Sequence, residues 1–406
     1  MIDRPSSLTS PLGPTPLRQM FRETDACEVL RLLRERDFKS TTELEQTAGL
    51  TRSRVSAALA ILKSQGLIES PTNRKRKGDG NSMPLCRDAA CGHVVGIDIG
   101  GSNLRIALAD MKGTVLGRWS TSTKGGSAPE MVIEQIQTGV IYLLQQASVP
   151  RRSLLAVAAG APGITNRDAG VVIATSYLKG WKNVPLRSLL ESAFGVPAVV
   201  ENDVRLGAIG EHWLGAARGV RNFVFLAIGT GIAMGIFVNG QLVHGADWAA
   251  GEVGYMLVPG APEPTLRRGK PGALESVIGG EGIKSQWLHS RNGKGTSLQS
   301  NLTATEIFDR AHTGDPLAKS VLDRTARILA SAVYNISLIL NSSLFVLGGG
   351  VGVNVSLRDA TQRVLKRYNS LVPPKLALSG LGQDAQLMGT IRLALDKAES
   401  GVGLTK

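Results

Sequence analysis

Two short stretches bring together residue types that bind phosphate and activate a hydroxyl group. In the first stretch, Asp98 follows an apolar run at residues 94–97 and precedes Gly100, Gly101 and Ser102. Glycines let backbone N–H groups approach a phosphate closely. An acid beside phosphates commonly serves a magnesium ion, directly or through water. This stretch alone leaves two interpretations open, a nucleotide triphosphate site and an ordinary glycine hairpin.

A second copy of this layout favours the nucleotide site. Residues 223–228 form an apolar run that leads into Gly229, Thr230 and Gly231 and then into another apolar run. Internal duplication predicts two similar lobes that face each other. Two glycine turns can then hold the phosphates of one ligand from both sides. We therefore expect an α/β fold with an actin-like duplication, of the kind found in nucleotide-dependent sugar phosphotransferases.

A further acid lies at the end of another predicted strand. Residues 196–200 deliver Glu201, Asn202 and Asp203 to the C-terminal end of that strand, where ligands bind in α/β sheets. Asp203 is placed there to act as a general base toward a substrate hydroxyl. Asp is also favoured at the N-cap of a helix, and a helix is expected to follow. Both interpretations of Asp203 stay open.

Two more acids complete a candidate set for a neutral sugar, because carboxylates and amides pair with adjacent hydroxyl groups. Glu252 lies in the glycine-rich residues 245–258, with Tyr255 three positions later, and Glu275 follows in the next apolar segment. Asn202 and Asp203 would complete the set. Each acid taken alone is more often a surface residue or a helix cap.

Length and composition indicate a globular chain of several domains. Its 406 residues predict two or three domains, and a hydrophobic content of 43% is ordinary for a globular chain. No apolar run reaches the ~18 residues of a membrane span. Three cysteines make a disulfide framework implausible. We expect a reduced, cytoplasmic protein without membrane association.

Residues 25–86 predict a winged helix-turn-helix. Capping boxes at Asp25 and Ser40 mark the starts of two helices, a third helix runs over residues 51–66, and a basic hairpin at residues 67–85 would form the wing. In such a unit the second helix of the two-helix motif enters the major groove of DNA. The sequence therefore predicts a DNA-binding head.

Positive charge is concentrated in this head. The whole chain carries a net charge of +13, and residues 51–77 contain seven Lys or Arg against one Glu. Such a surface neutralises DNA phosphates and makes binding sensitive to salt. The alternative is a module that holds an acidic protein surface. The residues expected to contact DNA are Thr51, Arg52, Ser53, Arg54 and Ser56 on the third helix and Arg74, Lys75, Arg76 and Lys77 in the wing.

Six motifs follow one another in an order that resembles the ROK family of repressors and sugar kinases. They are Asp98-Ile-Gly-Gly-Ser102, Gly160-Ala-Pro-Gly163, Glu201-Asn-Asp203, Gly229-Thr-Gly231, Gly251-Glu-Val-Gly254 and Leu347-Gly-Gly-Gly350. The resemblance covers about residues 93–398 and implies a duplicated, actin-like (ribonuclease H-like) sugar-kinase domain with two lobes. The winged helix-turn-helix in front resembles the family's repressor branch, which includes xylose and N-acetylglucosamine repressors.

The resemblance also implies roles for these residues. Asp203 would be the catalytic base that deprotonates the sugar hydroxyl attacking the γ-phosphate. Sugar hydroxyls would be held by Asn202, Asp203, Glu252, Tyr255 and Glu275. The phosphates of ATP, with Mg²⁺, would be held by Asp98, Gly100, Gly101, Ser102, Gly229, Thr230 and Gly231, and Gly348, Gly349 and Gly350 would lie on the adenosine side.

Two positions depart from the family pattern. Tyr255 stands where the family usually has a His that binds sugar and zinc, and no cysteine occurs between residues 255 and 275. No zinc is therefore expected, and no other metal ligands are assigned. Ala233 replaces the last glycine of the second phosphate loop, where its methyl group would crowd a phosphate. Asp98 and Asp203 are intact, so kinase activity stays open.

Two functions of different classes follow from these residues. The first is a sugar-responsive regulator, a repressor of carbohydrate-utilisation genes. It would bind operator DNA as a homodimer or homotetramer and take a sugar or sugar phosphate between its lobes. The second is an ATP-dependent sugar kinase, alone or combined with DNA binding. The predicted organisation is a tail (1–24), the head (25–86), a linker (87–92), the two-lobe domain (93–398) and a second tail (399–406).

Overall fold

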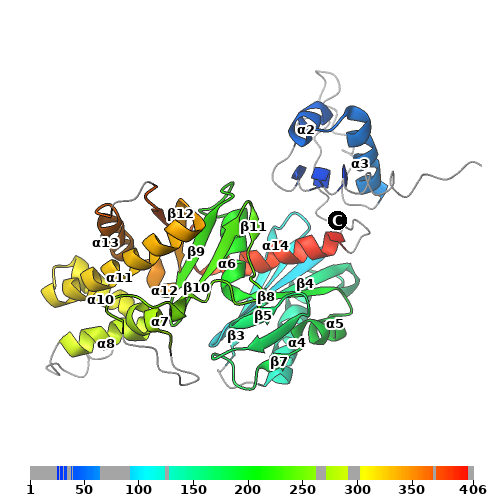
Figure 1. Ribbon diagram of the computed structural model, residues 1–406. Helices are drawn as coiled ribbons and strands as arrows, with labels where there is room; N and C mark the ends of the chain where they lie inside the picture. Colours follow the sequence, from blue (N-terminus) through cyan, green and yellow to red (C-terminus); the bar gives the residue numbers. More distant parts are fainter. Residues whose placement is uncertain are drawn as a thin grey trace, which may run out of the picture. The chain divides into compact units, whose positions relative to one another are not determined.

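The computed structural model describes residues 25–64 (without 27, 31, 34–37 and 39), 92–123, 128–261, 271–290, 302–368 and 372–400. The chain forms two compact units (Figure 1), which are considered separately. One is built around the N-terminal helices, and the other spans Val94–Ala109 and Val115–Leu395. Among the residues described, no helix has the length and apolar character that crossing a bilayer requires.

The head contains the predicted pair of helices, α2 (Thr41–Ala48) and α3 (Arg52–Ser64). Ser40 is the N-cap of α2, and its hydroxyl accepts a hydrogen bond of 3.2 Å from the Glu43 amide. Gly49 ends α2 in the left-handed region at φ +64°. The described residues between 25 and 33 are also helical. The predicted wing lies outside the described residues.

The first lobe of the larger unit is built on a five-stranded sheet. Its strand order is β3 (Val115–Ser122), β2 (Asn103–Asp110), β1 (His93–Ile99), β4 (Leu154–Ala161) and β8 (Ala198–Asn202). Helices α4 (Pro129–Gln146) and α5 (Leu186–Phe194) share its hydrophobic core. A small sheet of β5 (Ile164–Asn166), β6 (Val171–Ala174) and β7 (Lys182–Val184) and the short helix η2 (Arg151–Ser153) complete this lobe.

The second lobe repeats this plan. Its five-stranded sheet has the order β11 (Gln241–Leu242), β10 (Ile232–Val238), β9 (Phe223–Ile228), β12 (Leu344–Gly348) and β13 (Lys375–Leu378). In each lobe a glycine turn joins the third and second strands of that order. The predicted duplication is therefore confirmed by the strand order, and with it the two-lobe α/β fold.

Helices around the second sheet supply most of the second core. They are α7 (Ala273–Ile278), α8 (Gly280–Ser290), α10 (Ala304–His312), α11 (Pro316–Leu340), α12 (Gly349–Gly352) and α13 (Val355–Leu365), with the short η3 (Val253–Tyr255). Asp315 caps α11 by accepting hydrogen bonds from the amides of Leu317 and Ala318. Pro316 at the first helical position suits this start, since its missing N–H would be unpaired in any case.

Helix α6 (Asp203–Trp213) connects the two lobes. It contacts β4 and β8 of the first sheet and β9 and β10 of the second. It also lies against α14 (Ala385–Ser400), which follows the short η4 (Gly382–Asp384). A Cβ on Gly389 of α14 would lie 1.9 Å from the Leu206 carbonyl oxygen, so this crossing requires glycine. Because α6 contacts strands of both sheets, its first turn lies between them.

Candidate functional site

Asn202 and Asp203 lie where β8 passes into α6. Asn202 is the N-cap, because its Oδ1 accepts a hydrogen bond of 3.0 Å from the Arg205 amide. Its Nδ2 donates to the Gly163 carbonyl at 2.9 Å. The N-cap role that the sequence left open for Asp203 thus belongs to Asn202. Asp203 occupies the first helical position, and its Oδ1 accepts from the Val204 amide at 2.8 Å.

The pKa of Asp203 is raised to about 7. Burial is the largest cause, the negative charge of Asp98 is the next, and Glu252 adds to the rise against the effect of the Val204 amide. A carboxyl group that titrates near neutral pH is suited to accept a proton from a hydroxyl. It can equally hold a sugar hydroxyl by a hydrogen bond. Both predicted roles are compatible with this environment.

Glu252 is carried by a loop of the second lobe. Gly251, just before it, has φ +97°, and a Cβ there would lie 1.9 Å from the Met234 carbonyl oxygen, so only glycine fits. The Met234 amide donates to the Gly251 carbonyl at 2.8 Å and ties this loop to β10. Burial raises the pKa of Glu252, while Arg205 lowers it and Glu275 raises it further. The two predicted sugar acids of this lobe therefore interact.

Glu275 extends from α7 to the second glycine turn. Its Oε2 accepts a hydrogen bond of 3.1 Å from the Ile232 amide, and a Cβ on Gly231 would lie 3.2 Å from the same oxygen. The Gly280 amide, just after α7, donates to the Gly229 carbonyl at 2.8 Å. Burial raises the pKa of Glu275. A residue predicted for sugar thus lies directly beside a turn predicted for phosphate.

Tyr177 is a site residue that the motifs did not reveal. It follows β6, and burial raises the pKa of its hydroxyl to about 12, with the charges of Glu275, Asp203, Glu252 and Tyr255 adding to the effect in that order. Charged side chains from both lobes therefore lie close enough to this phenol to shift its pKa. The sequence offered only an aromatic residue in a loop, which carries no motif. Tyr255 itself is 64% exposed.

Asp98 has a partner that the sequence analysis did not include. Arg105 Nε and Nη2 lie 2.9 and 2.5 Å from Asp98 Oδ2, and Nη1 lies 2.5 Å from the Gln383 carbonyl oxygen. Burial raises the pKa of Asp98, and the charge and hydrogen bonds of Arg105 offset only part of that rise. The carboxylate that was predicted to lie beside the nucleotide phosphates is therefore held by a guanidinium group.

The two glycine turns have the expected hairpin form. The Gly100 amide donates to the Asn103 carbonyl at 2.8 Å, and the Gly229 amide donates to the Gly231 carbonyl at 2.9 Å. Thr230 is exposed at the tip of the second turn, as Ser102 is in the first. The phosphate-binding role of both turns remains a prediction.

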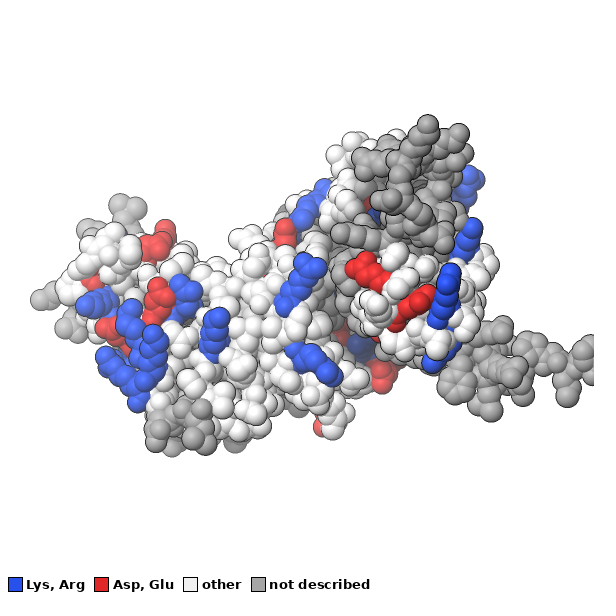
Figure 2. All heavy atoms as spheres, turned by 90° about the horizontal axis from the view of Figure 1, so that it is seen from above, with Lys and Arg blue, Asp and Glu red and all other residues white. Residues whose placement is uncertain are grey.

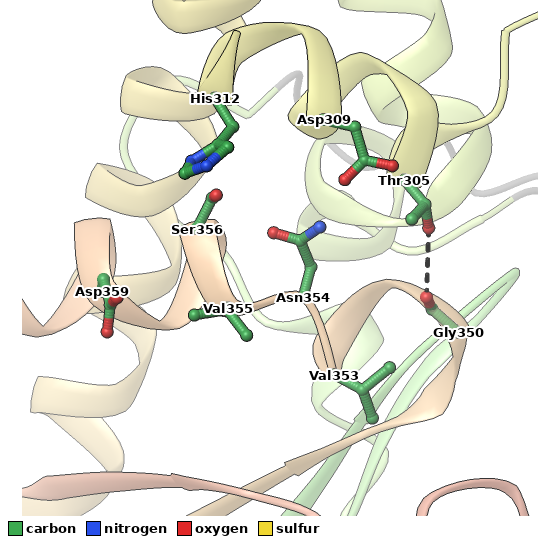
Figure 3. Close-up of a pocket in the computed structure, with 9 residues that line it drawn as sticks. All are labelled: Thr305, Asp309, His312, Gly350, Val353, Asn354, Val355, Ser356 and Asp359. Atoms are coloured by element: carbon green, nitrogen blue, oxygen red, sulfur yellow. Dashed lines mark hydrogen bonds between the residues drawn. The ribbon is translucent and has the colours of Figure 1, made fainter.

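The third glycine motif borders a cavity of about 510 Å³ (Figure 3). Helix α10 supplies Thr305, Asp309 and His312 to one wall, and residues 353–359 form the other. Thr305 Oγ1 donates to the Gly350 carbonyl at 3.3 Å. Gly348 is instead buried, and a Cβ there would overlap the Phe225 ring. The cavity lies where the resemblance places adenosine.

Glu201 anchors a buried cluster next to Asn202 and Asp203, two of the residues predicted to bind sugar. Its Oε1 lies 3.2 Å from Arg205 Nη1, and its Oε2 lies 2.8 Å from His244 Nε2. Arg205 Nη2 also donates to carbonyl groups of the following loop, including that of Ala250 at 3.3 Å. These contacts join β8 and α6 to the loop that carries Glu252. The sequence placed Glu201 in a motif but did not single out Arg205 or His244.

The predicted DNA contacts fall into three groups. Thr51, Arg52, Ser53 and Ser56 are exposed around the N-terminus of α3. Arg54 is exposed too, but its Nε and Nη2 bind the two carboxylate oxygens of Asp25 at 2.8 and 2.6 Å. Arg54 therefore ties α3 to the preceding helical segment. The third group, Arg74, Lys75, Arg76 and Lys77, lies outside the described residues.

Basic side chains are spread over the face shown in Figure 2, with acidic ones among them. On this face the charges are mixed, so the net charge of +13 does not by itself identify a DNA-binding surface there. The exposed start of α3 is the better candidate, because helix-turn-helix proteins contact base edges with this part of the recognition helix.

Comparisons with known proteins match both units. A model of the ROK family matches residues 94–397, and a model of bacterial regulatory proteins of the arsR family matches residues 25–70. The xylose repressor of Caldicellulosiruptor bescii is 25% identical over 387 residues, which cover 93% of this chain and 96% of the repressor. The glucokinase of Halalkalibacterium halodurans is 29% identical over 309 residues, which cover 73% of this chain and 92% of the glucokinase.

A solved structure has the same fold over nearly the whole chain. It is a ROK family transcriptional regulator described as a homolog of the E. coli MLC protein. The TM-score is 0.80 at 22% identity, and the match covers 94% of this chain and 98% of that one. At this level of identity the likeness concerns the fold alone. The predicted combination of a helix-turn-helix head with a sugar-kinase-like domain is therefore confirmed.

Proposed function

This chain belongs to the ROK family, and we propose that it is a sugar-responsive DNA-binding repressor of carbohydrate-utilisation genes. The observation that carries the proposal is the fusion of a helix-turn-helix head, with the exposed start of α3, to a two-lobe domain in which the sugar acids converge. The xylose repressor supports it, since that match includes the head as well as the ROK domain.

Sugar binding would couple to DNA binding through closure of the two lobes. Asn202 and Asp203 belong to the β8–α6 junction, whereas Glu252 and Glu275 come from the second lobe. A sugar that contacts both sets binds the closed arrangement better than the open one. Such differential affinity is what shifts a conformational equilibrium. The repressor would therefore release or reposition its heads when the sugar binds.

The expected partners follow from the same chemistry. Operator DNA would be bound by a homodimer or homotetramer in the cytoplasm, because helix-turn-helix dimers read two half-sites about one helical turn apart. A neutral monosaccharide, or its phosphate, would be the small-molecule ligand.

An ATP-dependent sugar kinase is the second candidate, favoured by Asp203 with a pKa of about 7. The cavity beside Gly350 has room for an adenosine group. The residues at the phosphate end fit Mg²⁺ poorly, since Asp98 Oδ2 is already bound to Arg105. No reaction step is therefore assigned to the nucleotide.

Two assays on the purified full-length chain separate these candidates. The first titrates DNA from the gene's own upstream region at several salt concentrations, with and without D-xylose or D-glucose. A repressor gives sequence-selective binding that weakens with salt and responds to a sugar. The second is a coupled ATP assay with the same sugars. Turnover near 10 per second, lost in Asp203→Asn, would favour the kinase. We expect Asp203→Asn to weaken sugar binding and leave sugar-free DNA binding unchanged.

A further inference from the structure

Tyr177 spans the space between the two glycine turns. A Cβ on Gly101 would lie 3.2 Å from Tyr177 Cβ, and a Cβ on Gly231 would lie 2.1 Å from Tyr177 Oη. The base of this side chain therefore packs against the first turn, and its hydroxyl end packs against the second. This is the space in which phosphates held from both sides would have to lie.

Arg105 places its positive charge beside the first glycine turn, where it binds Asp98. Two of its nitrogens bind Asp98 Oδ2, and the third bonds the Gln383 carbonyl, so the guanidinium is fixed at both ends. Its positive charge lies directly beside the Asp98 carboxylate, which is 6% exposed, and offsets part of the cost of burying it. A divalent cation at Asp98 Oδ2 would have to displace this guanidinium, and a cation at either carboxylate oxygen would lie near its positive charge.

We propose that Tyr177 and Arg105 close the phosphate end of the site, so that it binds a neutral sugar without a magnesium nucleotide. The inference deepens the proposed repressor function and rests on it, since it names the ligand class that the site accepts. The phenol excludes phosphate by occupying its volume, and the guanidinium replaces the cation. Glu275 Oε2 and the Tyr177 hydroxyl both approach Gly231, and the charges of Asp203 and Glu252 also act on the phenol. These three carboxylates would bind the sugar hydroxyls.

The phenol also discriminates among sugars. A sugar phosphate whose phosphate pointed toward the glycine turns would clash with Tyr177, which packs against both turns, and would be repelled by the acids whose charges act on this phenol. The unmodified sugar carries no such charge. Tyr177 is therefore a specificity-determining residue for neutral ligands.

The test measures binding of Mg–ATP and of D-xylose and D-glucose to the full-length chain by isothermal titration calorimetry. We expect one of the two sugars to bind the unmutated protein, with no saturable Mg–ATP binding up to millimolar concentration. Tyr177→Ala and the double variant Tyr177→Ala/Arg105→Ala should bind Mg–ATP at least tenfold more tightly. Tyr177 is 39% exposed and outside the hydrophobic core of its lobe, so its removal should not prevent folding.

Matched controls come from the same lobe. Tyr142→Ala removes an exposed tyrosine of α4, and Arg118→Ala removes an exposed arginine of β3 that pairs with Asp384. Neither should alter nucleotide affinity. Saturable Mg–ATP binding by the unmutated protein at or below millimolar concentration overturns the inference, as does a folded, sugar-binding double variant with no gain in nucleotide affinity. If the variants do not fold, the unmutated titration still decides. If neither sugar binds and Mg–ATP does not bind either, the result contradicts the proposed sugar-responsive function and leaves the closure of the phosphate end intact.

Discussion

His244 Nε2 donates a hydrogen bond of 2.8 Å to Glu201 Oε2 and thereby joins the end of β8 to the loop that leads to Glu252. Glu201 is fully buried, and Arg205 binds its other oxygen. A buried carboxylate with two partners of this kind fixes the relative positions of the elements that carry them. The acids predicted to bind sugar are thus held in fixed relative positions by Glu201, Arg205 and His244, which need not touch the ligand themselves.

Replacement of Glu201 by Gln should destabilise the protein by about 3–5 kcal/mol, because Arg205 would remain buried without its charge partner. The measurement is urea unfolding at pH 7. Glu281→Gln is the control, since Glu281 is 76% exposed and pairs only with Lys284 among the described contacts. Equal stability of the two variants would contradict the anchoring role of Glu201.

The same residue predicts a pH dependence of stability. Burial opposes ionisation of Glu201, but the His244 hydrogen bond and charge, the Asn202 amide and Arg205 outweigh it, and the net pKa lies below the usual 4.5. The stabilisation is therefore present above pH 4.5 and is lost as the pH falls through the lowered pKa. Unfolding free energies from pH 7 down to pH 3.5 should fall less steeply in Glu201→Gln than in the unmutated chain.

Arg52 and Arg54 should behave differently although they are neighbours on α3. Arg52→Ala should weaken operator binding by roughly 1–3 kcal/mol, the value of a base contact, with no loss of stability. Arg54→Ala should also destabilise the head, because Asp25 loses both of its hydrogen bonds. Fluorescence anisotropy with labelled operator and hydrogen exchange of residues 41–64 measure the two effects. Asp25→Asn should reproduce the faster hydrogen exchange of Arg54→Ala without weakening operator binding. Unchanged operator affinity in Arg52→Ala would exclude Arg52 as a DNA contact.

Asp203 should make sugar affinity depend on pH near neutrality. Its pKa is about 7, and an ionised carboxylate accepts stronger hydrogen bonds than a protonated one. The sugar affinity of the unmutated protein should therefore rise severalfold between pH 6 and pH 8. Asp203→Asn should bind the sugar more weakly, with an affinity that hardly changes with pH. A flat titration of the unmutated protein would rule out the carboxylate as a ligand.

Asp203 also predicts a pH dependence of stability. Because its pKa is higher in the folded protein than in the unfolded chain, the free energy of unfolding falls as the pH rises from about 4 to 7. Asp203→Asn should thus gain more stability at pH 8 than at pH 5.

The purified, untagged protein should contain no stoichiometric zinc. Tyr255 stands where the resemblance leads us to expect a zinc-binding histidine, and residues 255–275 contain no cysteine. Elemental analysis after dialysis measures the zinc content directly, with a sample exposed to excess zinc as the control. One zinc per chain after dialysis would refute the prediction.

Local patterns were sufficient to predict the architecture. The capping residue Ser40 and the terminating Gly49 bound α2 as expected, because caps and left-handed glycines act within one turn of the helix. The repeated glycine turns at Gly100 and Gly229 predicted the duplication that both sheets confirm. The motif at Glu201–Asp203 placed an acid at a strand end, which depends only on a strand followed by a helix.

The sequence by itself determined the helix pair of the head and the duplicated two-lobe fold and predicted the acids for a sugar, since each depends on neighbouring residues and periodic apolar positions. Only the tertiary structure decided which side chains meet. Glu201 and His244 are separated by 43 positions, and Tyr177 and Gly231 belong to different lobes. Asp98 and Arg105 are seven residues apart, yet their pairing depends on the hairpin between them. Such contacts are set by the packing of sheets and helices, and a chain read one segment at a time does not contain that packing.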